Sequence, residues 1–207
     1  RSQIPGYTFT DGGSNWSGKG DNQYGQIVGS DIYNDVFIGR FSAQNTTQVT
    51  NQVQKVINYE RNLTTSASWC QKGLGISASA GNSGHYSEDD YQHVENLRTD
   101  LLNYGYTTVY QDYASVSGYP SSSTTTISNH INSGVGIINY CNHGEQTGWQ
   151  SHYYMNSHVN ALTNNNMLPF IFSVACLVGQ YDYSSGDCFA ETWMHATNGS
   201  NLTGAID

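Results

Sequence analysis

Apolar residues along this chain recur with helical spacing in some segments and in short unbroken runs in others. The helical spacing predicts four helices, near residues 47–59, 87–104, 124–132 and 188–197. In the first, the apolar face is marked by positions i, i+4, i+7 and i+8, which are Val49, Val53, Val56 and Ile57. In the second, Ser87 stands three residues before Asp90, the pattern of a capped helix start, and Gly105 follows as a stop.

Short apolar runs bounded by glycine or polar residues predict strands between these helices. They lie at residues 36–38, 74–80, 106–110, 135–140 and 168–175, and those at 74–80, 135–140 and 168–175 are predicted to be buried. Alternating strands and helices are typical of right-handed βαβ units around a parallel sheet. The predicted fold class is therefore α/β, a three-layer αβα sandwich with a mainly parallel sheet. Residues 1–23 are rich in Gly, Ser and Asn without periodicity, which predicts an irregular arm.

The charge balance excludes nucleic acid as a partner. The chain has 7 Lys and Arg against 16 Asp and Glu, a formal net charge of −9, and such a surface repels phosphates. No apolar run approaches the roughly 20 residues of a membrane-spanning helix. Few lysines and five N-x-S/T triplets favour an exported protein; the triplets begin at Asn15, Asn45, Asn62, Asn198 and Asn201. The start at Arg1 favours a processed or partial chain.

Ligands of parallel sheets bind beyond the carboxyl ends of the strands, and two reactive side chains fall there. His143 follows the strand predicted at 135–140, and Cys176 follows the strand predicted at 168–175. A cysteine thiol, with a pKa of about 8.5, needs a neighbouring imidazole to act as a nucleophile near neutral pH. The amides of Gly144 and Cys176 can then hold a developing oxyanion. These residues alone leave two alternatives open: a cysteine used for packing and a His-Gly turn.

Seven segments carry a resemblance to a known family. They are YGQIVGSDIYNDVFIGRFS (24–42), INYERN (57–62), DYQH (90–93), LLNYGYT (101–107), INYCNHGEQTGW (138–149), LPFIFSVAC (168–176) and CFAETW (188–193). In this order they resemble the gingipain family of cysteine endopeptidases, caspase-like enzymes of Bacteroidetes-type bacteria, and the arginine-specific members more than the lysine-specific ones. The resemblance implies a caspase-like fold, with Cys176 as nucleophile, His143 as general base and acid, and the amides of Gly144 and Cys176 as oxyanion hole.

The same resemblance implies that Asp90 and Trp149 bind substrate. Asp90 falls where the arginine-specific enzymes have a carboxylate at the floor of the S1 pocket. A carboxylate pairs with a guanidinium through two parallel hydrogen bonds, which an ammonium does not match, so cleavage after Arg is expected. The alternative is that Asp90 returns a hydrogen bond to a helix cap at Ser87.

This chain departs from the family pattern at the predicted base. Family members have an acid that orients the histidine near the end of the strand matching residues 74–80, and this stretch has no carboxylate. Cys141 and Asn142 stand where Thr and Gly are more usual. The group that orients His143 is therefore unassigned.

The sequence assigns no cofactor to the chemistry. The resemblance implies structural calcium, and the candidate ligands are the acidic loop residues Asp21, Asp31 and Asp35. The alternative is that these residues form a solvated acidic loop. Two histidine pairs lack the i, i+4 spacing of a zinc site: His152 with His158, and His85 with His93. The four cysteines form no C-x-x-C pair.

The expected organisation is an arm with the last strand of a preceding subdomain in residues 1–45, then a caspase-like catalytic subdomain in 46–207 that is incomplete at its C-terminus. The expected function is a secreted or cell-surface cysteine endopeptidase. Its partners would be polypeptides with a basic P1 residue, and other fragments of the same precursor. One alternative is a catalytically inactive caspase-like surface or interaction protein, and another is a metal-dependent hydrolase.

Overall fold

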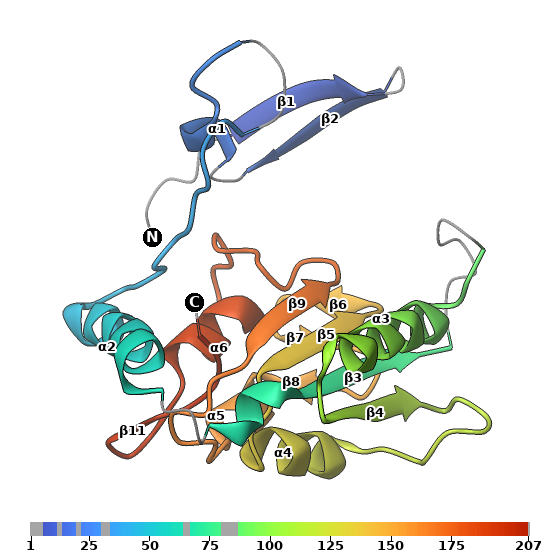
Figure 1. Ribbon diagram of the computed structural model, residues 1–207. Helices are drawn as coiled ribbons and strands as arrows, with labels where there is room; N and C mark the ends of the chain where they lie inside the picture. Colours follow the sequence, from blue (N-terminus) through green and yellow to red (C-terminus); the bar gives the residue numbers. More distant parts are fainter. Residues whose placement is uncertain are drawn as a thin grey trace.

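A four-stranded parallel sheet lies at the centre of the computed structural model (Figure 1). The structure describes residues 6–11, 14–19, 22–29, 34–63, 67–79 and 87–206, with backbone alone up to residue 23. The strand order is β4-β3-β5-β9, with bounds Thr108–Ala114, Lys72–Ala78, Ile137–Cys141 and Phe170–Val174. Neighbouring strands in this order are parallel, so their carboxyl ends meet at one edge of the sheet.

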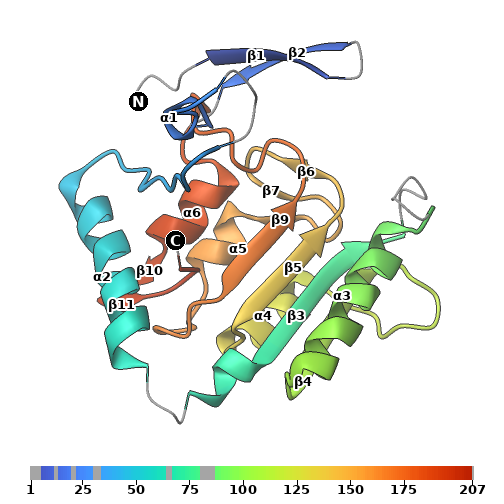
Figure 2. The ribbon, with the colours of Figure 1, turned by 45° about the horizontal axis from the view of Figure 1, so that its top comes forward.

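Helices cover both faces of this sheet, with α3 on one face and α4 and α5 on the other (Figure 2). The helices are α2 (Thr46–Asn62), α3 (Asp90–Tyr104), α4 (Thr124–Asn132), α5 (Asn156–Asn160), α6 (Phe189–His195) and the 3-10 helix η1 (Ser68–Gln71). This arrangement confirms the predicted three-layer αβα sandwich. No helix in the described part of the chain is long and apolar enough to cross a bilayer.

Short strands form two further small sheets in the described part of the chain after β5. β6 (Gly144–Glu145), β7 (Gly148–Trp149) and β8 (Tyr154–Met155) form a small antiparallel sheet directly after β5. β10 (Thr197–Asn198) and β11 (Asn201–Leu202) form a hairpin after α6.

The N-terminal segment differs from the irregular arm predicted for residues 1–23. β1 (Gly6–Asp11) and β2 (Ser14–Lys19) pair as an antiparallel hairpin, and α1 (Asn22–Gly25) follows. The prediction is therefore wrong for the described part of this segment. The signal was the pair of glycines between two stretches that contain Thr and aromatic residues, a pattern that favours hairpins.

The strand predicted at residues 36–38 is also wrong. Residues 34–43 form no strand, and the Phe37 side chain is fully exposed. An apolar triplet becomes a strand only where a neighbouring strand takes up its backbone hydrogen bonds, and none of the described strands lies beside it. The division of the chain at residue 45 stays a prediction.

The core lies on the sheet face that α4, α5 and α6 cover. Ile127 and Ile131 of α4 are fully buried there against Ile76 and Ile138 of the sheet. The predicted bounds of α4 are confirmed, because the hydroxyl of Ser123 caps its first turn. Burial of this kind is what drives the helix onto the sheet.

β9 is the last strand of the described sheet, and only one of its faces is covered. Ile171 packs against the core, whereas the side chains of the other face are exposed: Phe170, Phe172 and Val174. The buried strand predicted at 168–175 is therefore wrong for that face. An unbroken apolar run signals a buried strand only when both sheet faces are covered.

The most deeply buried side chains of α2 are polar, Gln52 and Lys55. Of the predicted apolar face, Val56 and Ile57 are half-buried, whereas Val49 and Val53 are exposed. The Gln52 amide donates to the carbonyl oxygen of Ser42 over 2.8 Å. Tertiary contacts, and not the apolar spacing, therefore decide which side of α2 faces inward.

The buried Lys55 joins α2 to the last turn of α6. Its Nζ donates to the carbonyl oxygens of Trp193 and Met194 over 3.0 and 2.7 Å. The last carbonyls of a helix carry the negative end of its dipole, so an ammonium there is stabilising.

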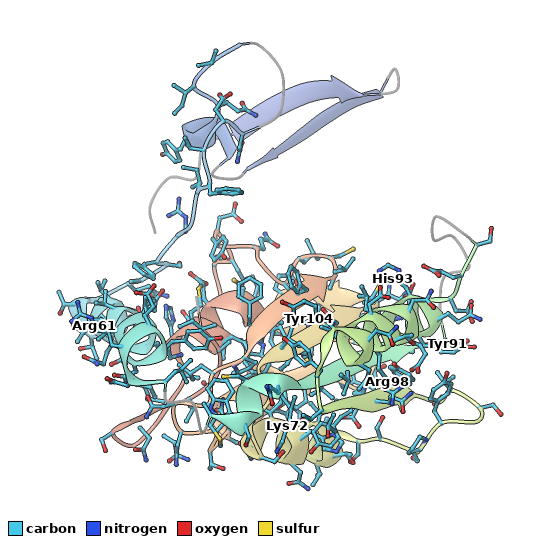
Figure 3. All side chains as sticks on the ribbon, viewed as in Figure 1. Arg61, Lys72, Tyr91, His93, Arg98 and Tyr104 are labelled. Carbon is cyan, nitrogen blue, oxygen red and sulfur yellow. The ribbon has the colours of Figure 1, made fainter. Side chains whose placement is uncertain are left out.

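We expect Lys55→Met to lower the free energy of unfolding by about 2–3 kcal/mol, because buried carbonyls lose a charged donor. Urea unfolding followed by circular dichroism measures the change. Arg61→Met is the matched control, because it removes the same charge from the exposed end of the same helix (Figure 3). Its expected cost is below about 1 kcal/mol, and equal losses in the two variants would contradict the anchoring role.

Candidate active site

The two predicted catalytic residues follow neighbouring strands at the same height. β5 and β9 are parallel neighbours, and their register pairs Cys141 with Val174. His143 and Cys176 each lie two residues beyond this pair, and the Asn142 amide still donates to the Val174 carbonyl over 3.3 Å. The side chains of His143 and Cys176 are both exposed. The sheet therefore brings these two residues to one edge, where a substrate can reach both.

Gly144 allows the loop after β5 to pack directly against the loop after β9. A Cβ atom at this position would lie 2.8 Å from the carbonyl oxygen of Cys176 and 2.8 Å from the Cβ of Ala175. Contacts this short leave no room for a side chain in a packed interior. Gly144 and Cys176 are thus close neighbours, and the oxyanion role of their amides stays a prediction.

Cys176 begins a strained three-residue turn. The Val178 amide donates to the Cys176 carbonyl over 2.8 Å, and Leu177 between them has a φ of 60°. This φ is unfavourable for leucine, because its Cβ crowds the backbone. Buried Val178 holds the turn, since its carbonyl accepts from the Ala190 amide of α6 over 2.9 Å. Backbone strain of this kind clusters at functional sites.

Buried Tyr140 fixes the backbone of His143. The Tyr140 hydroxyl donates to the carbonyl oxygen of His143 over 2.6 Å, and the Gln150 amide donates to the same oxygen over 3.0 Å. The Tyr140 ring stacks on Trp149 with centroids 4.4 Å apart. Nothing in the sequence signals this contact, because a tyrosine in a buried strand predicts packing alone.

Asp90 is the first residue of α3 and does not cap it. The N-cap is Asp89, whose amide donates to the Gln92 side chain over 2.8 Å. The alternative in which Asp90 returns a hydrogen bond to a cap at Ser87 is therefore wrong.

The Asp90 carboxylate points instead to the residue before the predicted base. Its Oδ2 accepts from Nδ2 of Asn142 over 2.8 Å, and Asn142 is largely buried. One of the two departures from the family pattern thus binds the predicted S1 carboxylate. The Asp90 carboxylate thus contacts the residue that directly precedes His143 in the sequence. Substrate binding by Asp90 stays a prediction.

Trp149 is not available to a substrate, and the prediction that it binds one is wrong. Its side chain is fully buried, and its Nε1 donates to the hydroxyl of Ser173 over 2.8 Å. Its ring packs among those of Tyr140, Phe189 and Trp193. Trp149 lies on β7 and belongs to the hydrophobic core, although it is close to His143 in the sequence.

Comparison with known proteins decides the family. The family model described as Peptidase family C25 matches residues 2–207. The chain belongs to peptidase family C25. This confirms the resemblance carried by the seven segments.

Family C25 relatives include both specificities of gingipain. Gingipain R2 of Porphyromonas gingivalis is 41% identical over 189 residues, which are 91% of this chain and 25% of that protein. Lys-gingipain HG66 of the same organism is 30% identical over 171 residues, 81% of this chain and 9% of that protein. The crystal structure of the Arg specific cysteine proteinase gingipain R has a TM-score of 0.84 at 40% identity, over 90% of this chain and 42% of that chain. The chain thus spans a quarter or less of the length of these curated relatives.

Within this family C25 chain, burial makes the other cysteines poor nucleophiles. Burial, with the nearby charges of Asp90 and Glu88, raises the pKa of Cys141 to about 11. Burial raises the pKa of Cys188 to about 12 and also raises that of Cys70. Cys176 is the exposed thiol among the four. A thiol reagent near neutral pH should therefore react at Cys176 first.

The same shifts predict a loss of stability at alkaline pH. The folded chain holds Cys141 neutral to a pKa of about 11, and Cys188 and Tyr154 to about 12, above their unfolded values. Groups with raised pKa values stabilise fully below the unfolded pKa and lose this contribution as pH rises through the folded pKa. We expect the melting temperature to fall by about 5–10 °C between pH 8 and pH 11. Thermal melts at several pH values measure it, and a melting temperature that stays constant would contradict these burial effects.

Of the acidic residues that are candidates for structural calcium, Asp35 lies within the described residues, whereas Asp21 and Asp31 lie outside them. Oδ2 of Asp35 accepts from the amides of Ile27 and Val28 over 2.7 and 2.8 Å, and these bonds lower its pKa. In the part of the chain that is described, no group of three or more His, Cys, Asp or Glu side chains is placed to hold a metal. The structural calcium that the family resemblance implies stays a prediction.

Proposed function

We propose that this chain carries the catalytic site of a secreted cysteine endopeptidase that cleaves after arginine. The observation that carries the proposal is the common position of His143 and Cys176, two residues beyond a registered pair on adjacent parallel strands. Membership of family C25 supports the reaction class. The similarity to gingipain R, an Arg specific cysteine proteinase, supports the choice of arginine.

The reaction begins with attack by the Cys176 sulfur on the scissile carbonyl. His143 takes the thiol proton, and the carbonyl oxygen becomes an oxyanion held by the amides of Gly144 and Cys176. The C–N bond then breaks, His143 gives its proton to the leaving amine, and a thioester acyl-enzyme remains. Water, deprotonated by His143, attacks the thioester and releases the new carboxyl group and the free thiol.

Asp90 is the residue proposed to bind the arginine side chain. Its carboxylate lies at the N-terminus of α3, bonded to Asn142 beside the base. A guanidinium can pair with the remaining carboxylate lone pairs while its arginine carbonyl reaches Cys176. A further proposed partner is a pro-segment of the same precursor, as in the solved complex of the pro- and mature domains of RgpB.

An arginyl chloromethyl ketone tests the proposal on the full-length protein. The Cys176 sulfur should displace chloride and form one thioether, found by mass spectrometry on the peptide that contains residue 176. Cys176→Ser should abolish the label, whereas Cys141→Ser, the control at a thiol with a raised pKa, should keep it. A lysyl reagent should react at least about 10-fold more slowly, as expected for a site built for a planar guanidinium.

The second candidate is an inactive caspase-like interaction protein. One observation favours it: within the described residues, no side chain hydrogen-bonds to the imidazole of His143. A base without an orienting partner works less well. No labelling by the arginyl reagent, in a protein with a cooperative thermal transition, would establish this candidate and reject the endopeptidase.

A further inference from the structure

A cavity of about 500 Å³ opens at the same sheet edge as His143 and Cys176. It is lined by the last two residues of β4, the loop that joins β4 to α4, the first residue of α4, and the loop that joins β7 to β8. These loops contribute hydroxyl groups and aromatic rings, including Tyr119, Ser121, Ser122, Ser151 and Tyr153. Among the described residues no Asp, Glu, Lys or Arg lines it, although the chain carries a net charge of −9.

His152 contributes an imidazole to the lining, and neighbouring hydroxyls bind both of its ring nitrogens. Nε2 lies 2.7 Å from the hydroxyl of Ser122, and Nδ1 lies 3.0 Å from the hydroxyl of Ser151. Burial lowers the pKa of His152, so the ring is neutral near neutral pH. The cavity therefore suits an uncharged group that can pack against rings and bond to hydroxyls.

Hydrogen bonds through the Tyr140 hydroxyl connect this cavity with the backbone of the predicted base. The Ser151 amide donates to the Tyr140 hydroxyl over 3.4 Å, and that hydroxyl donates to the His143 carbonyl over 2.6 Å. The Gln150 amide bonds to the same carbonyl. One wall of the cavity and the backbone of His143 are thus parts of one hydrogen-bonded unit.

The spacing between the cavity and the dyad fits an extended peptide. β4 lies two strands from β5 and three from β9 in the sheet, which is about 10 to 14 Å at a strand spacing of about 4.8 Å. An extended chain advances about 3.3 Å per residue, so this span corresponds to about three to four residues.

We propose that this cavity is a substrate subsite that binds a large uncharged aromatic side chain, tyrosine or phenylalanine, about three to four residues from the arginine. The proposal rests on the proposed function and adds a second determinant of substrate choice to Asp90. The aromatic ring packs against Tyr119 and Tyr153, and a phenolic hydroxyl bonds to the serine hydroxyls of the lining. A carboxylate or ammonium is rejected, because the lining offers it no opposite charge.

Internally quenched peptides with a single arginine test this proposal on the full-length protein. Tyr, Ala and Glu are placed in turn at each of the four positions on either side of the arginine, and a short arginine amide reporter serves as reference. We expect Tyr over Glu to raise kcat/KM by about 10-fold at one position about three to four residues from the arginine.

Two tryptophan variants then locate the effect. Ser121→Trp places an indole at the cavity rim, and Thr125→Trp is the matched control, since Thr125 is exposed on α4 and does not line the cavity. The ratio of kcat/KM for the Tyr peptide to that for the short reporter should fall about 10-fold in Ser121→Trp and stay at the wild-type value in Thr125→Trp. Tyr153→Ala, at an exposed ring of the lining, is the second variant if Ser121→Trp does not fold.

Each outcome separates the two proposals. Cleavage of the short reporter without a preference for Tyr at any position, or with a preference that survives in both Ser121→Trp and Tyr153→Ala, overturns the subsite and leaves the endopeptidase intact. A protein that cleaves neither the reporter nor the peptides overturns both.

Discussion

His143→Ala is expected to lower kcat for an arginine peptide substrate by about 10²- to 10⁴-fold, the range for loss of a general base and acid. In the proposed mechanism the imidazole takes the proton from the Cys176 sulfur and returns it to the leaving amine, so both halves of the reaction lose their proton carrier. KM should change less, because the arginine contact proposed at Asp90 does not involve this ring. Steady-state kinetics on the full-length protein measure both constants.

His93→Ala is the matched control for this change. His93 is exposed on α3, where its Nδ1 pairs with Glu88 over 2.8 Å (Figure 3). It should keep the wild-type kcat. Added imidazole should restore part of the rate in His143→Ala, because it can enter the space left at this exposed position. A full rate in His143→Ala would remove His143 from the mechanism.

Asp90→Asn is expected to lower kcat/KM for arginine substrates by about 10²- to 10³-fold, since losing one partner of a hydrogen-bonded charge pair costs about 2–5 kcal/mol. The asparagine side chain has the same shape and can still accept from Asn142, so the fold around His143 should be kept. The measurement is kcat/KM for paired peptides that differ only by Arg or Lys at the cleavage point. Their ratio should move toward one.

Asp100→Asn provides the control for charge. Asp100 is exposed further along the same helix, so its replacement removes the same charge without touching Asn142. Its arginine kinetics should match those of the unmodified protein. Unchanged specificity in Asp90→Asn together with a lower melting temperature would assign Asp90 a structural role alone.

Elements with local signals were predicted well from the sequence. α4 begins where the hydroxyl of Ser123 accepts from the amide of Thr126 over 3.2 Å, a cap contained within four residues. α3 ends at Gly105, whose φ of 119° is open to glycine and strained for other residues. The end of the strand before His143 was likewise marked by the polar Asn142. The end of β9 has no such signal, because apolar residues continue beyond it to Val178.

Features that depend on distant partners could not be predicted. Trp149 lies six residues from His143, yet its burial depends on rings contributed by α6. The inward side of α2 depends on the carbonyls that Lys55 meets at the far end of the chain. The contact of Asp90 with Asn142 joins residues 52 positions apart, and no spacing rule covers it.

The positive φ of Leu177 strains the backbone directly after Cys176. Glycine would adopt this backbone without strain, whereas its greater freedom in the unfolded chain would oppose folding. The same exchange would loosen the turn that follows Cys176, the proposed nucleophile. The leucine therefore gives up some stability of the folded chain and restricts the position of the thiol.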